Sequence, residues 1–96
     1  MIVVWSKRAR RELQKAHDYI SLDSEKNAEI VQNALVDLTI NLSTDPTKYP
    51  IDKFKTHNDG TWRAFEKYHY RISYRILKDR ILVARLRHVK RSPTTY

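Results

Sequence analysis

The chain has 96 residues, no cysteine and a formal net charge of +8. This length suits one domain with one modest core and excludes two domains. The absence of cysteine excludes disulfides and thiolate metal sites. The apolar run before Ser6 is too short for a signal peptide or a membrane span. We therefore expect one soluble, cytoplasmic domain that covers residues 1–96.

The charge is uneven along the chain. Residues 1–60 hold nine Lys/Arg and nine Asp/Glu, whereas residues 61–96 hold ten Lys/Arg and only two Asp/Glu. Such asymmetry points to a polyanion or an acidic protein as a partner. The alternative is a solvated basic surface that aids solubility.

The first half of the chain predicts a short strand followed by a helical hairpin. Residues 2–5, "IVVW", are β-branched and aromatic, which favours a buried strand. Ser6 suits a helix N-cap, and apolar residues then recur with helical spacing over residues 7–21. Asp23 or Ser24 can cap a second helix whose apolar stripe extends to Leu42. The short gap between the helices predicts that they are antiparallel.

The second half predicts three strands. Residues 43–60 are rich in turn residues and end at Gly60, the only glycine, which can supply a positive φ. The apolar period then becomes two, which predicts strands over residues 61–68, 70–77 and 80–90. A tight turn at residues 78–79 would join the last two. The expected fold class is α+β, with the order β-α-α-β-β-β and the helical hairpin packed on a small, mainly antiparallel twisted sheet.

Alternation assigns the faces of this sheet. The face toward the helices should carry Tyr70, Ile72, Tyr74 and Ile76 from one strand and Leu82, Ala84 and Leu86 from the next. The opposite face should carry Arg71, Ser73, Arg75, Arg85 and Arg87, as a positive and shallow groove. We also expect Trp5 and Trp62 in the core.

Three segments in this order resemble one protein family. They are "VVWSKRARRELQKAHDYI", "YHYRISYRI" and "ILVARLRHVKRSP". Together they resemble the RelE/ParE superfamily of bacterial type II toxin–antitoxin systems, of the plasmid stabilisation protein type, over essentially the whole chain. The resemblance implies a toxin held inactive in a hetero-oligomer by a cognate antitoxin.

The family divides by mechanism, and the sequence has traits of both branches. RelE-like members cut mRNA on the ribosome, whereas ParE-like members poison DNA gyrase. The "VVWS" opening and the long hairpin resemble the ParE branch; the dense Arg, His and Tyr content of the last strands resembles the RNA-cutting branch. Of these, we favour a ribosome-dependent, metal-independent mRNA endoribonuclease that inhibits translation. The alternatives are a gyrase poison or a non-catalytic basic nucleic-acid-binding module.

RNA cleavage without a metal needs a base, cations at the phosphorane and an acid. The resemblance implies these catalytic candidates: Arg71, Arg91, His88 and Tyr96. Candidates for RNA or phosphate binding are Arg63, Arg75, Arg85, Arg87, Lys90, Lys53 and Lys55. Arg63 stands where RelE-like members place a strand lysine, and arginine is a poorer base.

Each candidate also has a structural interpretation. Arg71 and Arg75 could be solvated strand cations, and His88, on the inner side of its strand, could be a structural histidine. Tyr96 is the last residue of the sequence, and because chain ends often fray it could lack a fixed position. The histidines at positions 17, 57 and 69 lack ligand spacing, so we expect no metal site and no cofactor.

Overall fold

The structure is a computed structural model that describes residues 1–90 and 95–96. Its elements are β1 (Ile2–Trp5), α1 (Lys7–Ser21), α2 (Glu25–Ile40), a 3₁₀ turn η1 (Asn41–Ser43), β2 (Trp62–Lys67), β3 (Tyr70–Ile76) and β4 (Arg80–His88). This confirms the predicted order and fold class. Both ends of β1 and the starts of β3 and β4 are as predicted, and the other strand ends differ by one or two residues.

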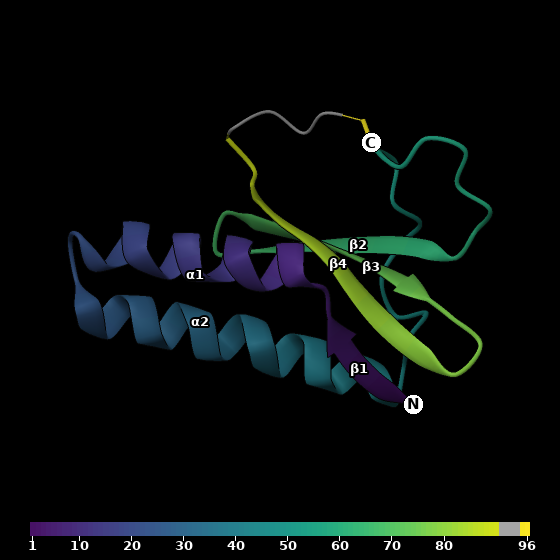
Figure 1. The fold of residues 1–96 in the computed structure, drawn as a ribbon, viewed down its shortest axis with the longest axis horizontal. Coiled ribbons are helices and arrows are strands. Elements are labelled where there is room, and N and C mark those ends of the chain that lie inside the picture. The colour runs from purple at the N-terminus through teal and green to yellow at the C-terminus, as the bar shows by residue number, and fades with distance from the viewer. Residues whose placement is uncertain (91–94) are drawn as a thin grey trace.

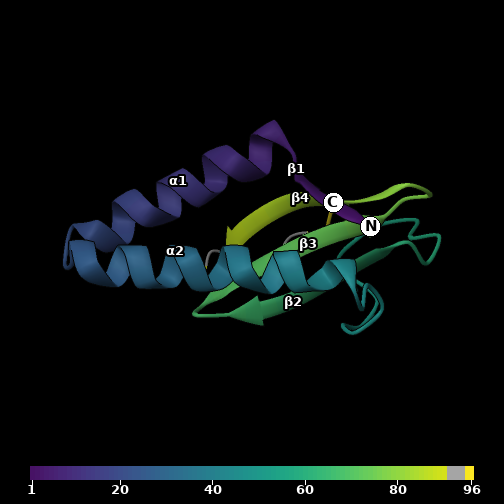
Figure 2. The same ribbon diagram turned by 90° about the horizontal axis from the view of Figure 1, so that it is seen from below.

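The two helices begin at the predicted caps. Ser6 Oγ accepts a hydrogen bond from the Ala9 N–H (3.0 Å), and Ser24 Oγ accepts one from the Asn27 N–H (3.1 Å). These bonds satisfy amides that have no partner inside the helix. In Figure 2 the helices meet at their connecting turn and diverge toward the end of the molecule that carries β1. The antiparallel hairpin is thus present as predicted.

The sheet has the strand order β1-β4-β3-β2. β1 is parallel to β4, and the other two pairings are antiparallel. Figure 1 shows the sheet beside the helical hairpin, with the chain end at Tyr96 close to the loop that precedes β2. A two-residue turn joins β2 to β3, and its residues Tyr68 and His69 both have positive φ (53° and 70°). This geometry suits a tight hairpin but strains non-glycine residues.

The core lies between the helices and one face of the sheet. Its fully buried side chains include Leu35, Ile72, Tyr74, Ile81 and Val83. The prediction for β3 is therefore confirmed, since Tyr70, Ile72 and Tyr74 all belong to this core cluster.

The prediction for the first half of β4 was wrong. Ile81 and Val83 face the core there, rather than Leu82 and Ala84. The register explains the error, because Ser73 pairs with Arg85 while Tyr74 pairs with Val83, so Ala84 is an unpaired bulge residue. One extra residue reverses the alternation. Leu86, beyond the bulge, faces the core as predicted.

The N-cap of α1 and a side chain of its second turn satisfy the edge of β4 beyond the end of β1. The Ser6 hydroxyl donates to the Ala84 carbonyl (3.0 Å), and Glu12 Oε1 accepts from the Leu86 N–H (2.9 Å). These bonds replace the strand pairing that β1 provides only as far as Val83. They fix α1 against the bulged part of β4.

Candidate functional site

The strand register places one set of side chains on the face of the sheet turned away from the helices. We call it the outer face; it is formed by Trp62, Ala64, Glu66, Arg71, Ser73, Arg75, Leu82, Arg85 and Arg87. The predicted grouping of the four arginines is confirmed. The prediction that Trp62 lies in the core was wrong, because it is paired with Arg75 and so points to the outer face.

Arg71 lies at the centre of this face and is held between two carboxylates. Its Nη2 donates to Asp52 Oδ1 (2.8 Å), and its Nη1 donates to Glu66 Oε2 (2.9 Å). The guanidinium also lies 4.6 Å from the centre of the Phe54 ring. Only 8% of Arg71 is exposed, so it is not a solvated strand cation. Charge-assisted bonds of this length are strong, and they occupy the end of the guanidinium.

Asp52 is the carboxylate that the loop before β2 inserts into the outer face. It is 1% exposed; its Oδ1 accepts from the Phe54 N–H (3.0 Å) and its Oδ2 accepts from the Tyr96 hydroxyl. Burial raises the pKa of Asp52, but hydrogen bonds from the Tyr96 hydroxyl, Arg71 and the Phe54 N–H outweigh it and hold the pKa below its usual 3.8. Asp52 is therefore ionised at neutral pH.

Tyr96 is docked on the outer face. Its N–H donates to the Phe54 carbonyl (2.9 Å), and its carbonyl oxygen accepts from the Thr56 N–H (2.7 Å). The ring lies 4.8 Å from the Arg87 guanidinium and packs edge-on against Trp62. Burial, together with the bond to Asp52, raises the pKa of Tyr96 well above its usual 10. The hydroxyl therefore stays protonated and acts as a donor.

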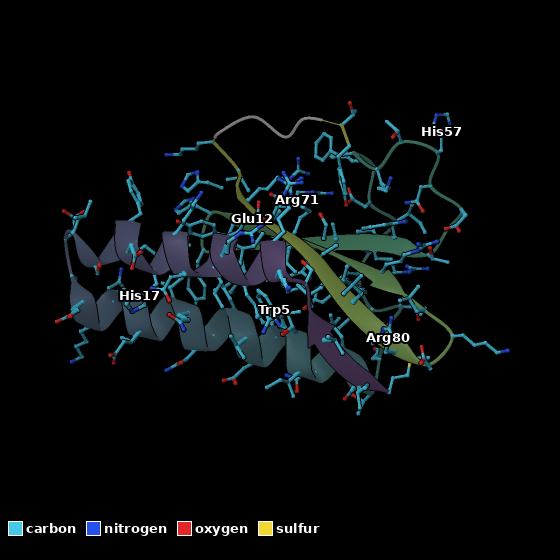
Figure 3. All side chains as sticks on the ribbon, in the orientation of Figure 1. Trp5, Glu12, His17, His57, Arg71 and Arg80 are labelled. Atoms are coloured by element: carbon cyan, nitrogen blue, oxygen red, sulfur yellow. The ribbon has the colours of Figure 1, made fainter. Side chains whose placement is uncertain are left out.

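The other arginines of the outer face also have protein partners. Arg75 Nε donates to the Thr61 hydroxyl (3.1 Å), and Arg85 Nη2 donates to Glu12 Oε2 (3.1 Å). In Figure 3, Glu12 reaches from α1 toward the region where Arg71 lies. Burial, with Arg85 nearby, lowers the pKa of Arg87. Much of the cationic character predicted for this face is thus neutralised within the fold.

A cavity of about 250 Å³ opens at one end of the outer face. It is lined by Lys53, Phe54, Glu66, Arg71, Arg87, His88 and Val89. The structure therefore brings four of the predicted site residues together: Lys53, Arg71, Arg87 and His88. His88 comes from the opposite side of the strand, since it is paired with Tyr70, and its Nδ1 accepts from the Lys90 N–H (3.1 Å).

Arg63 and Lys55 are among the predicted site residues that do not line this cavity. Arg63 pairs with Tyr74, on the helix side of the sheet, and its Nη1 donates to the Tyr49 carbonyl (2.7 Å). Arg63 thus holds the loop before β2. Lys55 lies over the rings of Trp62 and Tyr96 (5.0 and 5.3 Å to the ring centres). Arg91 lies outside the described residues.

We find no group of three or more His, Cys, Asp or Glu able to hold a metal among residues 1–90 and 95–96. His17 on α1 and His57 in the loop before β2 lie at opposite ends of the molecule (Figure 3). No helix in that part of the chain is both long and apolar enough to cross a membrane.

Sequence reasoning missed Asp52, Glu12 and Phe54 as parts of the site. Asp52 stands alone in a loop 19 residues before its partner, so no local spacing signals the pair. Glu12 is 73 residues from Arg85. The sequence indicates only that such partners should exist, because an outer face with so many cations requires carboxylates from elsewhere in the chain. It does not indicate which carboxylates they are.

Comparisons with known proteins agree with this architecture. The model of the family described as "ParE toxin of type II toxin-antitoxin system, parDE" matches residues 3–93. Among curated proteins, none matches the sequence significantly. A chain in the structure "Chromosomal ParDE TA system from P. aeruginosa" is similar with a TM-score of 0.72 and 16% identity, over 92% of this chain and 95% of that chain. A chain of the RelBE2 toxin–antitoxin complex from Mycobacterium tuberculosis gives a TM-score of 0.63 and 21% identity, over 91% and 95%.

The two structural likenesses, both below 25% identity, establish the fold, and the family match covers nearly the whole chain. The fold and the family match together define the protein class as a toxin of a type II toxin–antitoxin system. Within that class, the chain belongs to the ParE toxin family. The resemblance noted from the sequence is therefore confirmed at the level of the superfamily.

Proposed function

We propose that this toxin acts in the ParE manner, by binding and poisoning DNA gyrase, rather than by cutting mRNA. The observation that carries the proposal is the state of Arg71, whose guanidinium is buried between Asp52 and Glu66. The catalytic hypothesis requires this arginine to meet a phosphorane. A phosphate at that place would have to displace two carboxylates, one of which is fully buried.

The other catalytic candidates support the same conclusion. The Tyr96 hydroxyl donates to ionised Asp52, and the raised pKa of Tyr96 makes it a weak acid. Arg63, at the position of the strand lysine of RelE-like members, bonds a loop carbonyl on the other side of the sheet. Groups that could act as base, clamp and acid are thus engaged in holding the fold. The sequence resemblance assigns a non-nuclease mechanism to the ParE branch.

Ribosome-dependent mRNA cleavage is the second candidate. It is favoured by the cavity that gathers Lys53, Arg87 and His88 beside Arg71. A phosphate there would find cations and a histidine, the residue type most often used for proton transfer in catalysis. For this reading, Arg87 rather than Arg71 would be the cation that stabilises the transition state.

We also propose a cognate antitoxin as the partner that holds the toxin inactive. Both similar structures are described as a toxin–antitoxin system or complex. The arginines on the outer face are already neutralised in part by Glu12, Asp52 and Asp59, so an acidic antitoxin segment would find fewer open cations there than the sequence suggested.

The test is controlled expression in which growth arrest, mRNA 5′ ends and DNA supercoiling are followed in the same cultures. Gyrase poisoning predicts arrest with an SOS response, filaments and intact mRNA. New 5′ ends spaced from the ribosomal A site would refute it and establish the second candidate. The absence of any arrest would favour a non-catalytic binding module and refute both.

Variants sharpen the distinction. Arg87→Ala and Arg91→Ala should abolish activity if the toxin is a nuclease, and Lys78→Ala, in the exposed turn before β4, is the matched control. Arg71→Ala is informative only together with a thermal melt, because this arginine is part of a buried ion pair. If the toxin binds gyrase, we expect Arg71→Ala to lower stability and to lower activity in proportion.

A further inference from the structure

The charge of the chain is distributed differently in space than along the sequence. Residues 1–60 hold as many acids as cations. Three of these acids, however, pair with arginines of the sheet: Glu12 with Arg85, Asp52 with Arg71, and Asp59 with Arg75. Cations of the first half of the chain therefore lose counter-charges to the outer face. The excess positive charge reappears on α1.

α1 carries an exposed cationic surface that we call the α1 patch. It consists of Lys7, Arg10, Arg11 and Lys15, with Gln14 among them. The spacing i, i+3, i+4, i+7 and i+8 places these residues on one face, opposite the buried Ala9 and Ala16. A shallow hollow of about 370 Å³ is lined by Lys7, Arg10, Arg11 and Gln14. None of the four cations has an ion pair within residues 1–90 and 95–96.

The acids of α1 do not neutralise this patch. Glu12 is turned toward β4, where it accepts from Arg85 (3.1 Å) and from the Leu86 N–H (2.9 Å). Asp18, one turn beyond the patch, accepts from Gln14 (2.9 Å). The first turn of α1 contains no acid. The charges of the patch therefore do not stabilise the helix by interacting with its dipole, which favours negative charge at the N-terminus. The cations of the patch thus do not stabilise the fold through ion pairs or through the dipole.

We propose that the α1 patch binds the phosphodiester backbone of nucleic acid. Eight rises of 1.5 Å put its ends about 12 Å apart, which matches three to four phosphates of one strand at about 3.4 Å each along the helix axis. Arginine forks bind phosphate oxygens in pairs. Within residues 7–15 no large hydrophobic side chain is exposed, so the patch lacks the apolar anchors that a bound protein segment would use. This surface is separate from the outer face and does not depend on how the toxin acts.

The experiment compares two variants of equal net charge. One replaces the patch (K7Q/R10Q/R11Q/K15Q); the matched control replaces four exposed lysines elsewhere (K26Q/K48Q/K67Q/K78Q). The full chain and both variants are made by cell-free synthesis, and circular dichroism verifies their folding. Fluorescence anisotropy then follows binding to a random-sequence DNA duplex and to a single-stranded RNA at several salt concentrations.

On duplex DNA, log K falls as log salt rises, with a slope of roughly −0.9 for each phosphate contact. We expect this slope to become less steep by about 3 in the patch variant and by less than about 1 in the control. The nucleic acid on which the patch variant shows the larger change in slope, DNA or RNA, is the one that the patch binds. Equal losses in both variants would overturn the proposal, because they would mean a response to net charge alone. Tighter patch-dependent binding to a poly-glutamate peptide than to either nucleic acid would also overturn it, in favour of a protein partner. Growth arrest plays no part in this readout, so its result is independent of the gyrase proposal.

Discussion

Removal of the Asp52 carboxylate is the most direct test of how the outer face is held together. In Asp52→Ala, Arg71 would remain buried with only Glu66 as an ionic partner, and the Phe54 N–H and the Tyr96 hydroxyl would lose their acceptor. Breaking a buried pair by removing one partner costs about 3–5 kcal/mol. Because Glu66 remains, we expect a value near the lower limit, about 3 kcal/mol of unfolding free energy.

The matched control is Glu66→Gln. The Glu66 side chain is 51% exposed, and its bond to Arg71 is therefore screened by water. We expect this change to cost less than about 1 kcal/mol. For a domain of this size, a loss of about 3 kcal/mol lowers Tm by roughly 12–24 °C. The two variants should thus be well separated in a thermal melt.

Urea unfolding followed by tryptophan fluorescence measures both changes. Trp62 lies on the outer face and contacts the Tyr96 ring, so its emission reports on this region. Equal costs for Asp52→Ala and Glu66→Gln would refute the assignment of Asp52 as the principal partner of Arg71. In addition, Asp52→Ala combined with Arg71→Met should be less destabilised than the sum of the single variants, because no unpaired charge is left buried.

Three further predictions concern stability. The pKa of Asp52 is depressed in the folded state, so ionised Asp52 adds its full share to the free energy of unfolding above the unfolded value near 3.8, and this share is lost as the pH falls through the folded pKa. Unfolding measured over an acid pH range should show this loss in the wild type and a weaker one in Asp52→Asn. Tyr68→Asn with His69→Gly places residues that tolerate positive φ at both turn positions, which relieves backbone strain and should raise the unfolding free energy by about 1–2 kcal/mol. A decrease would mean that the lost ring contacts contribute more than the relieved strain. Glu12→Ala leaves the Leu86 N–H without its acceptor and should cost about 1–2 kcal/mol in urea unfolding; a change within 0.5 kcal/mol of zero would show that water replaces the carboxylate.

The local sequence was sufficient to predict the elements of this fold. Helical spacing and the cap at Ser6 predicted where α1 begins, and the cap of α2 was narrowed to Asp23 or Ser24, of which the structure uses Ser24. Capping and periodicity involve residues that are neighbours in the chain, so the local sequence contains them. The period of two in β3 identified its core side for the same reason. The order of the elements and the quoted segments then led to the superfamily, which the family match confirms.

Which residues in the first half of β4 face the core depended on tertiary structure. Both alternating sets of residues 81–84 are apolar, so the sequence pattern fits either face. The bulge at Ala84 decided between them, and it depends on pairing with β3 and on the bond from Leu86 to Glu12 of α1. One unpaired residue changes which side chains are buried on either side of it.

The electrostatics of the outer face also arose only on folding. The sequence gives Arg71 a predominantly basic neighbourhood, whereas the fold brings Asp52 to within 2.8 Å of it and docks Tyr96 on the same carboxylate. These contacts join segments 19 and 44 residues apart, so no spacing rule contains them. Charge counted along a chain fixes its total but not its position, because opposite charges pair through space. In this protein that pairing neutralises much of the sheet, whereas four cations of α1 stay exposed without an ion pair among the described residues.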